Sequence, residues 1–234
     1  MVRGRDSGKI AAAKRALEYI RDGMVIGLGS GTTVAKFVEL LGNKVREEGL
    51  EVQVVPTSID SKIMALRQRI RVTYLDEHPS PDIAVDGADE VDPSRNLIKG
   101  GGGAMLREKV VDYASKIFIV IVDETKLVNH LCEKRPIPLE VIPFAWRTVI
   151  RTLTEEFRGK AILRPCGGGK LGPVVTDNGN FIVDFFPKNL EFDVESIDVE
   201  LKRIPGVLET GVFLGSKVSK VIVGRSDGTV FEMS

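Results

Sequence analysis

The sequence is poor in the side chains that most nucleophilic and metal-dependent enzymes use. Its 234 residues include only two histidines, His78 and His130, and only two cysteines, Cys132 and Cys166. So few histidines exclude a histidine-rich metal site and argue against a Ser-His-Asp or Cys-His catalytic device. The cysteines form no CxxC pair, which predicts structural thiols in a reducing, cytoplasmic compartment. If the protein is an acid–base enzyme, carboxylates and lysines must carry the chemistry.

The sequence also lacks a long apolar run and an excess of charge of either sign. Its longest strongly apolar segment, residues 117–122, is far shorter than the ~18 residues that a membrane span needs. Residues 1–7 are polar, so no signal peptide is expected. The 33 basic residues balance the 33 acidic ones, whereas a nucleic-acid-binding protein normally has a basic excess or stripe. We therefore expect neither a membrane nor a nucleic acid as partner.

The most distinctive stretch runs from residue 82 to residue 109. Four carboxylates follow a short apolar run at 83–85, namely Asp86, Asp89, Glu90 and Asp92. Lys99 then leads directly into four glycines at 100–103, and a helix is predicted after them. Each glycine inside a helix or strand costs roughly 0.5–1 kcal/mol relative to alanine, so this run favours a loop whose N–H groups approach an anion or oxyanion. Taken alone, the acidic segment is explained by an ordinary turn and the glycine run by a flexible loop. The occurrence of both in one short stretch favours a functional site.

A second glycine-rich segment, residues 27–33, lies between a predicted strand at 24–28 and a helix predicted from Val34. The free N–H groups and the positive dipole end of such a helix favour an anion, and the hydroxyl side chains of the segment add donors. The segment matches neither GxxxxGK[ST] nor GxGxxG, so a phosphomonoester suits it better than a nucleotide. A plain strand-to-helix turn is the alternative. The glycines at 167–169 precede no predicted helix and are expected to form a structural loop.

Strands and helices are predicted to alternate through the first half of the chain. Strands are expected at 24–28, 51–55, 70–75 and 117–122, the last as a strand covered on both faces of a parallel sheet. Ser7 is expected to cap a first helix that ends at Arg21. The helix after the glycines is expected to bury Met105 or Leu106, together with Val110 and Tyr113. If the strands are parallel, Lys126 emerges at the same edge as the acidic turn.

From about residue 133 the pattern changes to that of a compact α+β unit. Its order β-α-β-β-α-β resembles a ferredoxin-like fold, and Asn178-Gly179 between apolar runs predicts a hairpin. We therefore predict an α/β protein with a Rossmann-like, mostly parallel sheet and helices on both faces, plus a smaller ferredoxin-like domain. The first domain is expected to comprise residues 1–132 and about 206–234, and the second about 133–205.

Five segments in this order resemble those of the type A ribose-5-phosphate isomerases. They are GLGSGTT (27–33), DGADEVD (86–92), KGGGGAMLREK (99–109), DETK (123–126) and VVTDNGNFIVD (174–184). One departure is GSGTT where many members have GTGST, an exchange of hydroxyls that keeps the donors. The resemblance implies an aldose–ketose isomerase that interconverts ribose 5-phosphate and ribulose 5-phosphate in the non-oxidative pentose phosphate pathway. It implies a cis-enediolate, no metal and no organic cofactor.

The resemblance also implies roles for individual residues. Glu108 would shuttle the proton, while Asp86 and Asp89 would bind sugar hydroxyls and help to open the furanose ring. The implied substrate contacts are Ser30, Gly31, Thr32 and Thr33 at the phosphate, Gly87, Ala88, Lys99, Gly100, Gly101 and Gly102 at the sugar and enediolate, and Lys9 and Lys126. The small domain is expected to be a lid and subunit contact, in a homodimer or homotetramer.

Three other interpretations stay open at this point. An amino-sugar phosphate deaminase would use a similar glycine loop and acidic turn, but with a histidine near the acids. A non-catalytic sugar-phosphate sensor would need a DNA-binding module, for which a sheet starting near residue 24 leaves no room. A metal site is disfavoured because the acids at 86, 89 and 92 are three residues apart, not two as in a calcium loop.

Overall fold

The computed structural model describes residues 2–169 and 171–234. The chain divides into two compact units. The first comprises Met1–Ala88, Arg107–Lys126 and Ser216–Ser234, and the second comprises Asp89–Leu106 and Leu127–Gly215.

This division differs from the boundaries expected from the sequence, because residues 89–106, 127–132 and 206–215 lie in the second unit. The packing explains the difference. Ile98, Val128 and Val212 are fully or almost fully buried in the core of the second unit.

The first unit is built on a seven-stranded sheet with strand order β14-β13-β7-β4-β1-β2-β3. All neighbouring strands are parallel except β13 and β14, which are antiparallel. The strands are β1 (Val25–Leu28), β2 (Gln53–Pro56), β3 (Arg71–Val72), β4 (Ile83–Asp86), β7 (Phe118–Asp123), β13 (Lys220–Gly224) and β14 (Val230–Met233). The helices are α1 (Val2–Leu17), α2 (Thr32–Glu47), α3 (Ile59–Arg67), α4 (Met105–Ala114, whose first two residues belong to the second unit), η1 (Glu124–Lys126) and η3 (Gly215–Lys217, whose first residue belongs to the second unit).

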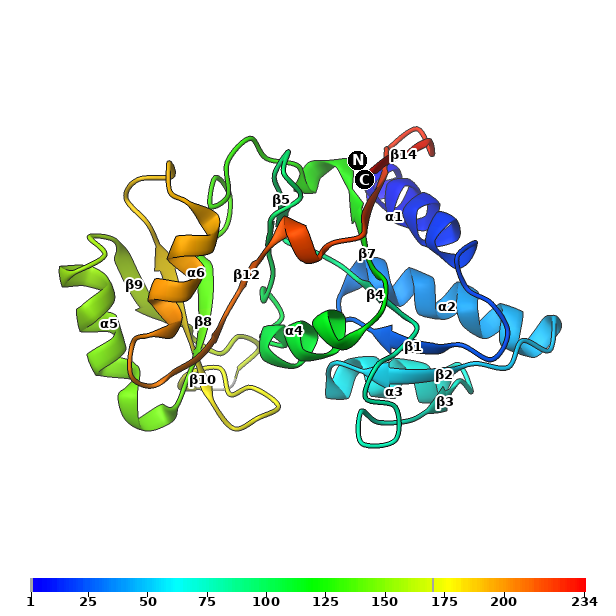
Figure 1. Cartoon of the computed structure of the whole chain (residues 1–234), viewed down its shortest axis with the longest axis horizontal. Coiled ribbons are helices and arrows are strands. Elements are labelled where there is room, and N and C mark those ends of the chain that lie inside the picture. Colours follow the sequence, from blue (N-terminus) through cyan, green and yellow to red (C-terminus); the bar gives the residue numbers. More distant parts are fainter. Residues whose placement is uncertain (1, 170) are drawn as a thin grey trace. The chain divides into compact units, whose positions relative to one another are not determined.

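Helices cover both faces of this sheet, as the period-2 alternation of strand side chains requires. In β1, Ile26 and Leu28 are buried in one core with residues of α1, α2 and α3. Val25 points to the other face, where it packs with Val55 of β2 and Val111 of α4. Figure 1 shows α1 and α2 in dark and medium blue, next to each other. The predicted α/β architecture is confirmed.

Three local predictions for this unit need correction. The first helix begins at Val2 and ends at Leu17, so Ser7 lies inside it and does not cap it. In α4 the exposed residue is Val110, 53% exposed, whereas Val111 is buried. The sequence has two adjacent valines there, and the choice between them depends on which face of the helix meets the sheet. The strand predicted at 70–75 is only Arg71–Val72.

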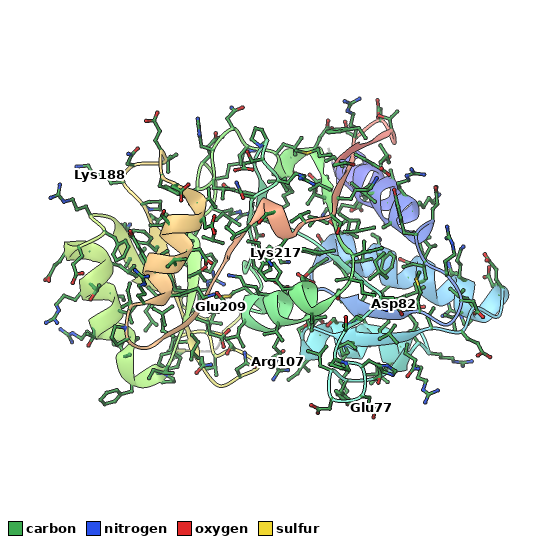
Figure 2. All side chains as sticks on the ribbon, in the orientation of Figure 1. Glu77, Asp82, Arg107, Lys188, Glu209 and Lys217 are labelled. Carbon is green, nitrogen blue, oxygen red and sulfur yellow. The ribbon has the colours of Figure 1, made fainter. Side chains whose placement is uncertain are left out.

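Asp82, labelled in Figure 2, fixes the start of β4 beside β1. Its carboxylate accepts a hydrogen bond from the Val25 amide at 3.0 Å and one from Lys116 Nζ at 2.7 Å. The hydrogen bond from Lys116 contributes most to lowering the pKa of Asp82 below its ordinary value. These contacts set the register from which Asp86, at the other end of the strand, is positioned.

The second unit contains a four-stranded antiparallel sheet with strand order β11-β8-β10-β9. Its elements are β8 (Ile137–Val141), η2 (Pro143–Ala145), α5 (Trp146–Glu155), β9 (Lys160–Leu163), β10 (Phe181–Phe186), α6 (Val194–Lys202) and β11 (Val207–Thr210). This is the predicted β-α-β-β-α-β order of a ferredoxin-like fold. Asn178 and Gly179 do form a turn, but the segment before them makes only isolated bridges, such as Val175 with Phe181, and no strand.

A smaller three-stranded antiparallel sheet, which the sequence did not predict, completes the second unit. It consists of β5 (Glu90–Val91), β6 (Leu97–Ile98) and β12 (Val212–Phe213). The acidic turn is therefore a short hairpin in which residues 92–96 connect two buried dipeptides. No helix in the described part of the chain is both long and apolar enough to cross a membrane.

Candidate active site

In the first unit, the glycine-rich segment after β1 forms a helix N-terminus suited to an anion. Gly31 immediately precedes α2 with φ of 96°, a left-handed conformation that favours glycine. No side chain of the described residues caps this end of α2, so a bound anion is a natural partner for its first-turn N–H groups. Lys9 of α1 donates a hydrogen bond from Nζ to Thr32 Oγ1 at 3.0 Å. The structure thus brings Lys9 to the predicted phosphate loop, and its contact with substrate stays a prediction.

Asp86, the last residue of β4, is fully buried and fixed against this loop. Its Oδ1 accepts the amide hydrogen of Ser30 at 3.0 Å and that of Gly87 at 2.6 Å. The backbone at Gly29 passes so close that a Cβ there would lie 1.9 Å from Asp86 Oδ1. The glycine at position 29 is therefore required by the approach of the carboxylate.

Thr57 and Ser58 belong to the same edge, although neither is among the site residues expected from the sequence. Ser30 Oγ lies 3.1 Å from Thr57 Oγ1 and donates to Ser58 Oγ at 2.8 Å. Ser58 also caps α3 through a reciprocal capping box with Ser61. Their position in the sequence could have identified them. Both hydroxyls directly follow β2, the strand next to β1, and neighbouring parallel strands end at the same edge of a sheet.

Lys126 and Glu108 complete the predicted residues of the first unit. Lys126 ends η1, directly after β7, and β7 is parallel to β4, so it emerges at the edge where Asp86 lies. Glu108 lies in the first turn of α4 and is only 5% exposed. Charged side chains are rarely buried to this degree unless they are paired or functional.

In the second unit, Asp89 and Lys99 lie beside the second glycine segment, residues 100–103. Asp89 Oδ2 accepts the amide hydrogen of Gly101 at 2.7 Å. Lys99 is 3% exposed, and its Nζ lies 5.3 Å from the centroid of the Phe213 ring. Gly100 has φ of 103°, and the amide of Gly103 donates to the Gly100 carbonyl at 3.0 Å. The N–H of Gly101 is thus already used by Asp89, which leaves Gly100 and Gly102 as the residues with N–H groups for an oxyanion role.

Glu90, next to Asp89, has a structural role instead. Its fully buried carboxylate accepts backbone N–H bonds from Cys132 at 2.6 Å, Lys134 at 2.5 Å and Arg135 at 2.8 Å. Burial raises the pKa of Glu90, and these three bonds offset only part of that effect. Burial also raises the pKa of the Cys132 thiol, so that this cysteine stays protonated and unreactive.

Asp92 likewise stabilises the hairpin, because it accepts hydrogen bonds from the backbone amide and the side chain of Asn96 at 2.8 and 2.9 Å. Among the described residues, no group of three or more His, Cys, Asp and Glu side chains is arranged to hold a metal ion.

Comparison with known proteins gives the family. A family model described as ribose 5-phosphate isomerase A (phosphoriboisomerase A) matches residues 53–228. A ribose-5-phosphate isomerase A from Archaeoglobus fulgidus is 50% identical over 226 residues, covering 96% of this chain and 98% of the relative. The chain belongs to the ribose 5-phosphate isomerase A family. The enzyme of that name from Methanocaldococcus jannaschii is 51% identical over 221 residues, which are 94% of this chain and 95% of the relative.

Solved structures of this isomerase family have the same fold. The structure of ribose 5-phosphate isomerase A from Methanocaldococcus jannaschii matches with a TM-score of 0.91 and 49% identity, covering 97% of each chain. A D-ribose-5-phosphate isomerase in complex with phospho-erythronic acid matches with a TM-score of 0.92 and 48% identity, again over 97% of each chain. The isomerase fold is therefore shared over almost the whole chain.

Proposed function

We propose that the protein interconverts ribose 5-phosphate and ribulose 5-phosphate through a cis-enediolate, as part of the non-oxidative pentose phosphate pathway. No metal or organic cofactor takes part in this reaction. The observation that carries the proposal is the fixed pairing of a phosphate-type loop with a buried acid, Ser30 with Asp86, in a chain of the isomerase family. This pairing suits a ligand that has a phosphate at one end and hydroxyls at the other.

The phosphate binds at the N-terminus of α2. Ser30, Thr32 and Thr33 supply hydroxyl donors there, Gly31 lets the backbone approach the ligand, and the helix dipole favours the negative charge. Lys9 and Lys126 add positive charge. Lys9 is already joined to the loop through Thr32.

The sugar is recognised by the acidic turn. Asp86 and Asp89 accept hydrogen bonds from sugar hydroxyls and promote opening of the furanose, with Gly87 and Ala88 between them giving the backbone room to approach. Asp86 is held by two backbone N–H bonds and Asp89 by one, so neither carboxylate has to be ordered when the sugar binds.

Glu108 is the base. Its carboxylate removes the proton from C2 of the open aldose, and the electrons move through the new C1–C2 double bond onto the aldehyde oxygen O1. A proton then passes from O2 to O1, and Glu108 returns the first proton to C1 to give the ketose. Lys99 and the N–H groups of Gly100 and Gly102 stabilise the negative charge of the enediolate.

The ligand of a related structure supports this chemistry. Phospho-erythronic acid, bound in one solved isomerase of the family, carries a planar carboxylate on a phosphorylated four-carbon chain. A carboxylate presents two oxygens and shared negative charge, as the O1 and O2 atoms of an enediolate do. A site that binds this acid is therefore complementary to the enediolate.

We also propose a cytoplasmic homodimer or homotetramer in which the ferredoxin-like unit supplies a subunit contact. Phe144, in η2 of that unit, is 96% exposed and Ile142, two residues before it, is 36% exposed, so these apolar side chains are available to a subunit contact. Light scattering on the wild type and on Phe144→Ser tests this. A monomeric wild type would contradict the proposal, and a smaller assembly for the variant is the expected result.

Substrate specificity tests the function directly. Purified protein in EDTA should form ketose from ribose 5-phosphate and should release no ammonia from glucosamine 6-phosphate. Ammonia release without pentose turnover would favour an amino-sugar phosphate deaminase. Binding of ribose 5-phosphate without turnover would favour a sugar-phosphate sensor.

A further inference from the structure

Arg164 makes contacts in the second unit that the proposed mechanism does not use. It directly follows β9, and its Nη1 donates to the carbonyl oxygens of Gly100 at 2.8 Å and Gly101 at 3.2 Å. The rest of its guanidinium is paired with Asp184 of β10, through Nε to Oδ2 at 2.8 Å and through Nη2 to Oδ1. One side chain therefore joins the glycine loop to the central part of a sheet.

The pair has the properties of a rigid support. The side chains of Arg164 and Asp184 are only 15% and 16% exposed, and a bidentate arginine–carboxylate pair fixes the plane of the guanidinium. The Arg164 amide also donates to the Ile182 carbonyl at 2.8 Å, which continues the pairing between β9 and β10 beyond Leu163. The guanidinium thus has little freedom to move away from the loop.

The contacts act on individual peptide groups of the loop. The carbonyl of Gly100 and the N–H of Gly101 belong to the same peptide plane, and Arg164 binds the first while Asp89 binds the second. The carbonyl of Gly101 shares its plane with the N–H of Gly102. In a trans peptide these two groups point in opposite directions, so the bond to Arg164 turns the Gly102 N–H away from the guanidinium.

A glycine loop needs such support more than other loops do. Glycine has the widest choice of backbone conformations, so the loop sequence itself specifies its peptide orientations poorly. A cavity of about 370 Å³, lined by Asp89, Gly101, Arg164, Asp184 and neighbouring residues, lies next to the contact. The loop therefore borders open space on the side of the arginine, so Arg164 supports it where packing is loose.

We propose that Arg164, fixed by Asp184, is a positioning residue that orients the peptide groups of residues 100–102 for the enediolate and holds Asp89 in place through the shared Gly100–Gly101 peptide. The proposal rests on the isomerase function above. It assigns to the ferredoxin-like unit a part in stabilising the transition state, carried by a side chain that need not touch the substrate.

The test compares Arg164→Lys and Asp184→Asn with wild type, with Arg151→Lys on the exposed side of α5 as a matched control. Lysine keeps the charge but cannot bond the carboxylate and both carbonyls in one plane. Both variants should lose on the order of 10- to 100-fold in kcat with little change in KM, because misplaced groups weaken the transition state more than the ground state. The control should match the wild type.

Inhibition by phospho-erythronic acid distinguishes positioning from a merely structural role. Its Ki should rise in both variants in proportion to the loss of kcat/KM, while thermal unfolding shows the variants to be folded. The double variant should be little worse than either single one, since both break the same support. Wild-type kcat and Ki in a folded Arg164→Lys would overturn the inference. Absence of turnover in the wild type would instead overturn the isomerase function.

Discussion

The amide of Ser30 donates a hydrogen bond to the buried carboxylate of Asp86, with 3.0 Å between nitrogen and oxygen. The two residues are 56 positions apart in the sequence and lie at the carboxyl ends of the neighbouring parallel strands β1 and β4. One contact therefore joins the proposed phosphate loop to the proposed sugar-binding acid. A change that moves either residue should affect the recognition of both ends of the substrate.

Gly29→Ala tests this coupling. The added methyl group would lie 1.9 Å from Asp86 Oδ1, so the carboxylate or the loop must shift. A displacement of about 1 Å costs on the order of 10²-fold in rate, and we expect kcat/KM to fall by that order. Gly167→Ala is the control, because no atom of the described residues lies within 4 Å of its Cβ position. Equal activity of the two variants would contradict the coupling.

Lys9→Met should mainly weaken substrate binding. Lys9 reaches the proposed phosphate loop through Thr32, and an ion pair at an exposed position contributes at most about 1 kcal/mol. We expect a severalfold higher KM for ribose 5-phosphate, kcat close to that of wild type, and a difference that shrinks in high salt. Lys14→Met, on an exposed position of the same helix, should leave KM unchanged. A change in kcat with no change in KM would contradict a role for Lys9 in binding the phosphate.

Two neighbouring acids should respond differently to neutralisation. Glu90→Gln places an amide among three backbone N–H donors, which should destabilise the protein by about 1–3 kcal/mol. Asp89→Asn keeps an acceptor for the Gly101 amide but loses the charge, so it should remain stable and lose activity. Urea unfolding and steady-state kinetics on both variants distinguish these effects. A stable Glu90→Gln or a fully active Asp89→Asn would contradict the assigned roles.

Glu232 of β14 should stabilise the protein at neutral pH and lose this effect at acid pH. Burial alone would raise the pKa of this carboxyl, but hydrogen bonds from Lys220, Arg15 and Tyr19 outweigh burial and lower it to about 2 from 4.5. Because the pKa is lower in the folded state, the stabilisation is complete above pH 4.5 and is lost as the pH falls towards 2.

Glu232→Gln should therefore cost on the order of 1–3 kcal/mol at pH 7 and progressively less below pH 4.5. Urea unfolding of wild type and variant at pH 7, 4 and 3 measures this difference. A difference in unfolding free energy that does not change with pH would show that the carboxylate charge contributes nothing.

Local signals predicted much of the fold. Ser58 directly precedes the helix at Ile59–Arg67 and caps it, and a serine in this position is a local signal for the start of a helix. The six-residue apolar run became β7 in the middle of a sheet covered on both faces, as its composition indicated. Periodicity could not predict which of the adjacent Val110 and Val111 is buried. Val111 is the buried one, because its side of the helix faces the sheet.

Sequence patterns indicate candidate site residues only where these are clustered in the sequence. The glycine loops and acids stand close together in short motifs, whereas Arg164 lies 64 residues beyond the Gly100 carbonyl that it contacts. The separate roles of Asp89 and Glu90 depend on which backbone amides face each carboxylate, and Glu90 receives its amides from residues 132–135. Such long-range contacts leave no local pattern in a single sequence.

The most direct measurement is ketose formation from ribose 5-phosphate in EDTA, with wild type and Glu108→Gln side by side. We expect metal-free turnover by the wild type. For the variant we expect a loss of about 10²–10⁴-fold in kcat with KM nearly unchanged, because glutamine has no base to move the C2 proton. Preserved turnover in the variant, or activity of the wild type only with an added divalent ion, would contradict the account.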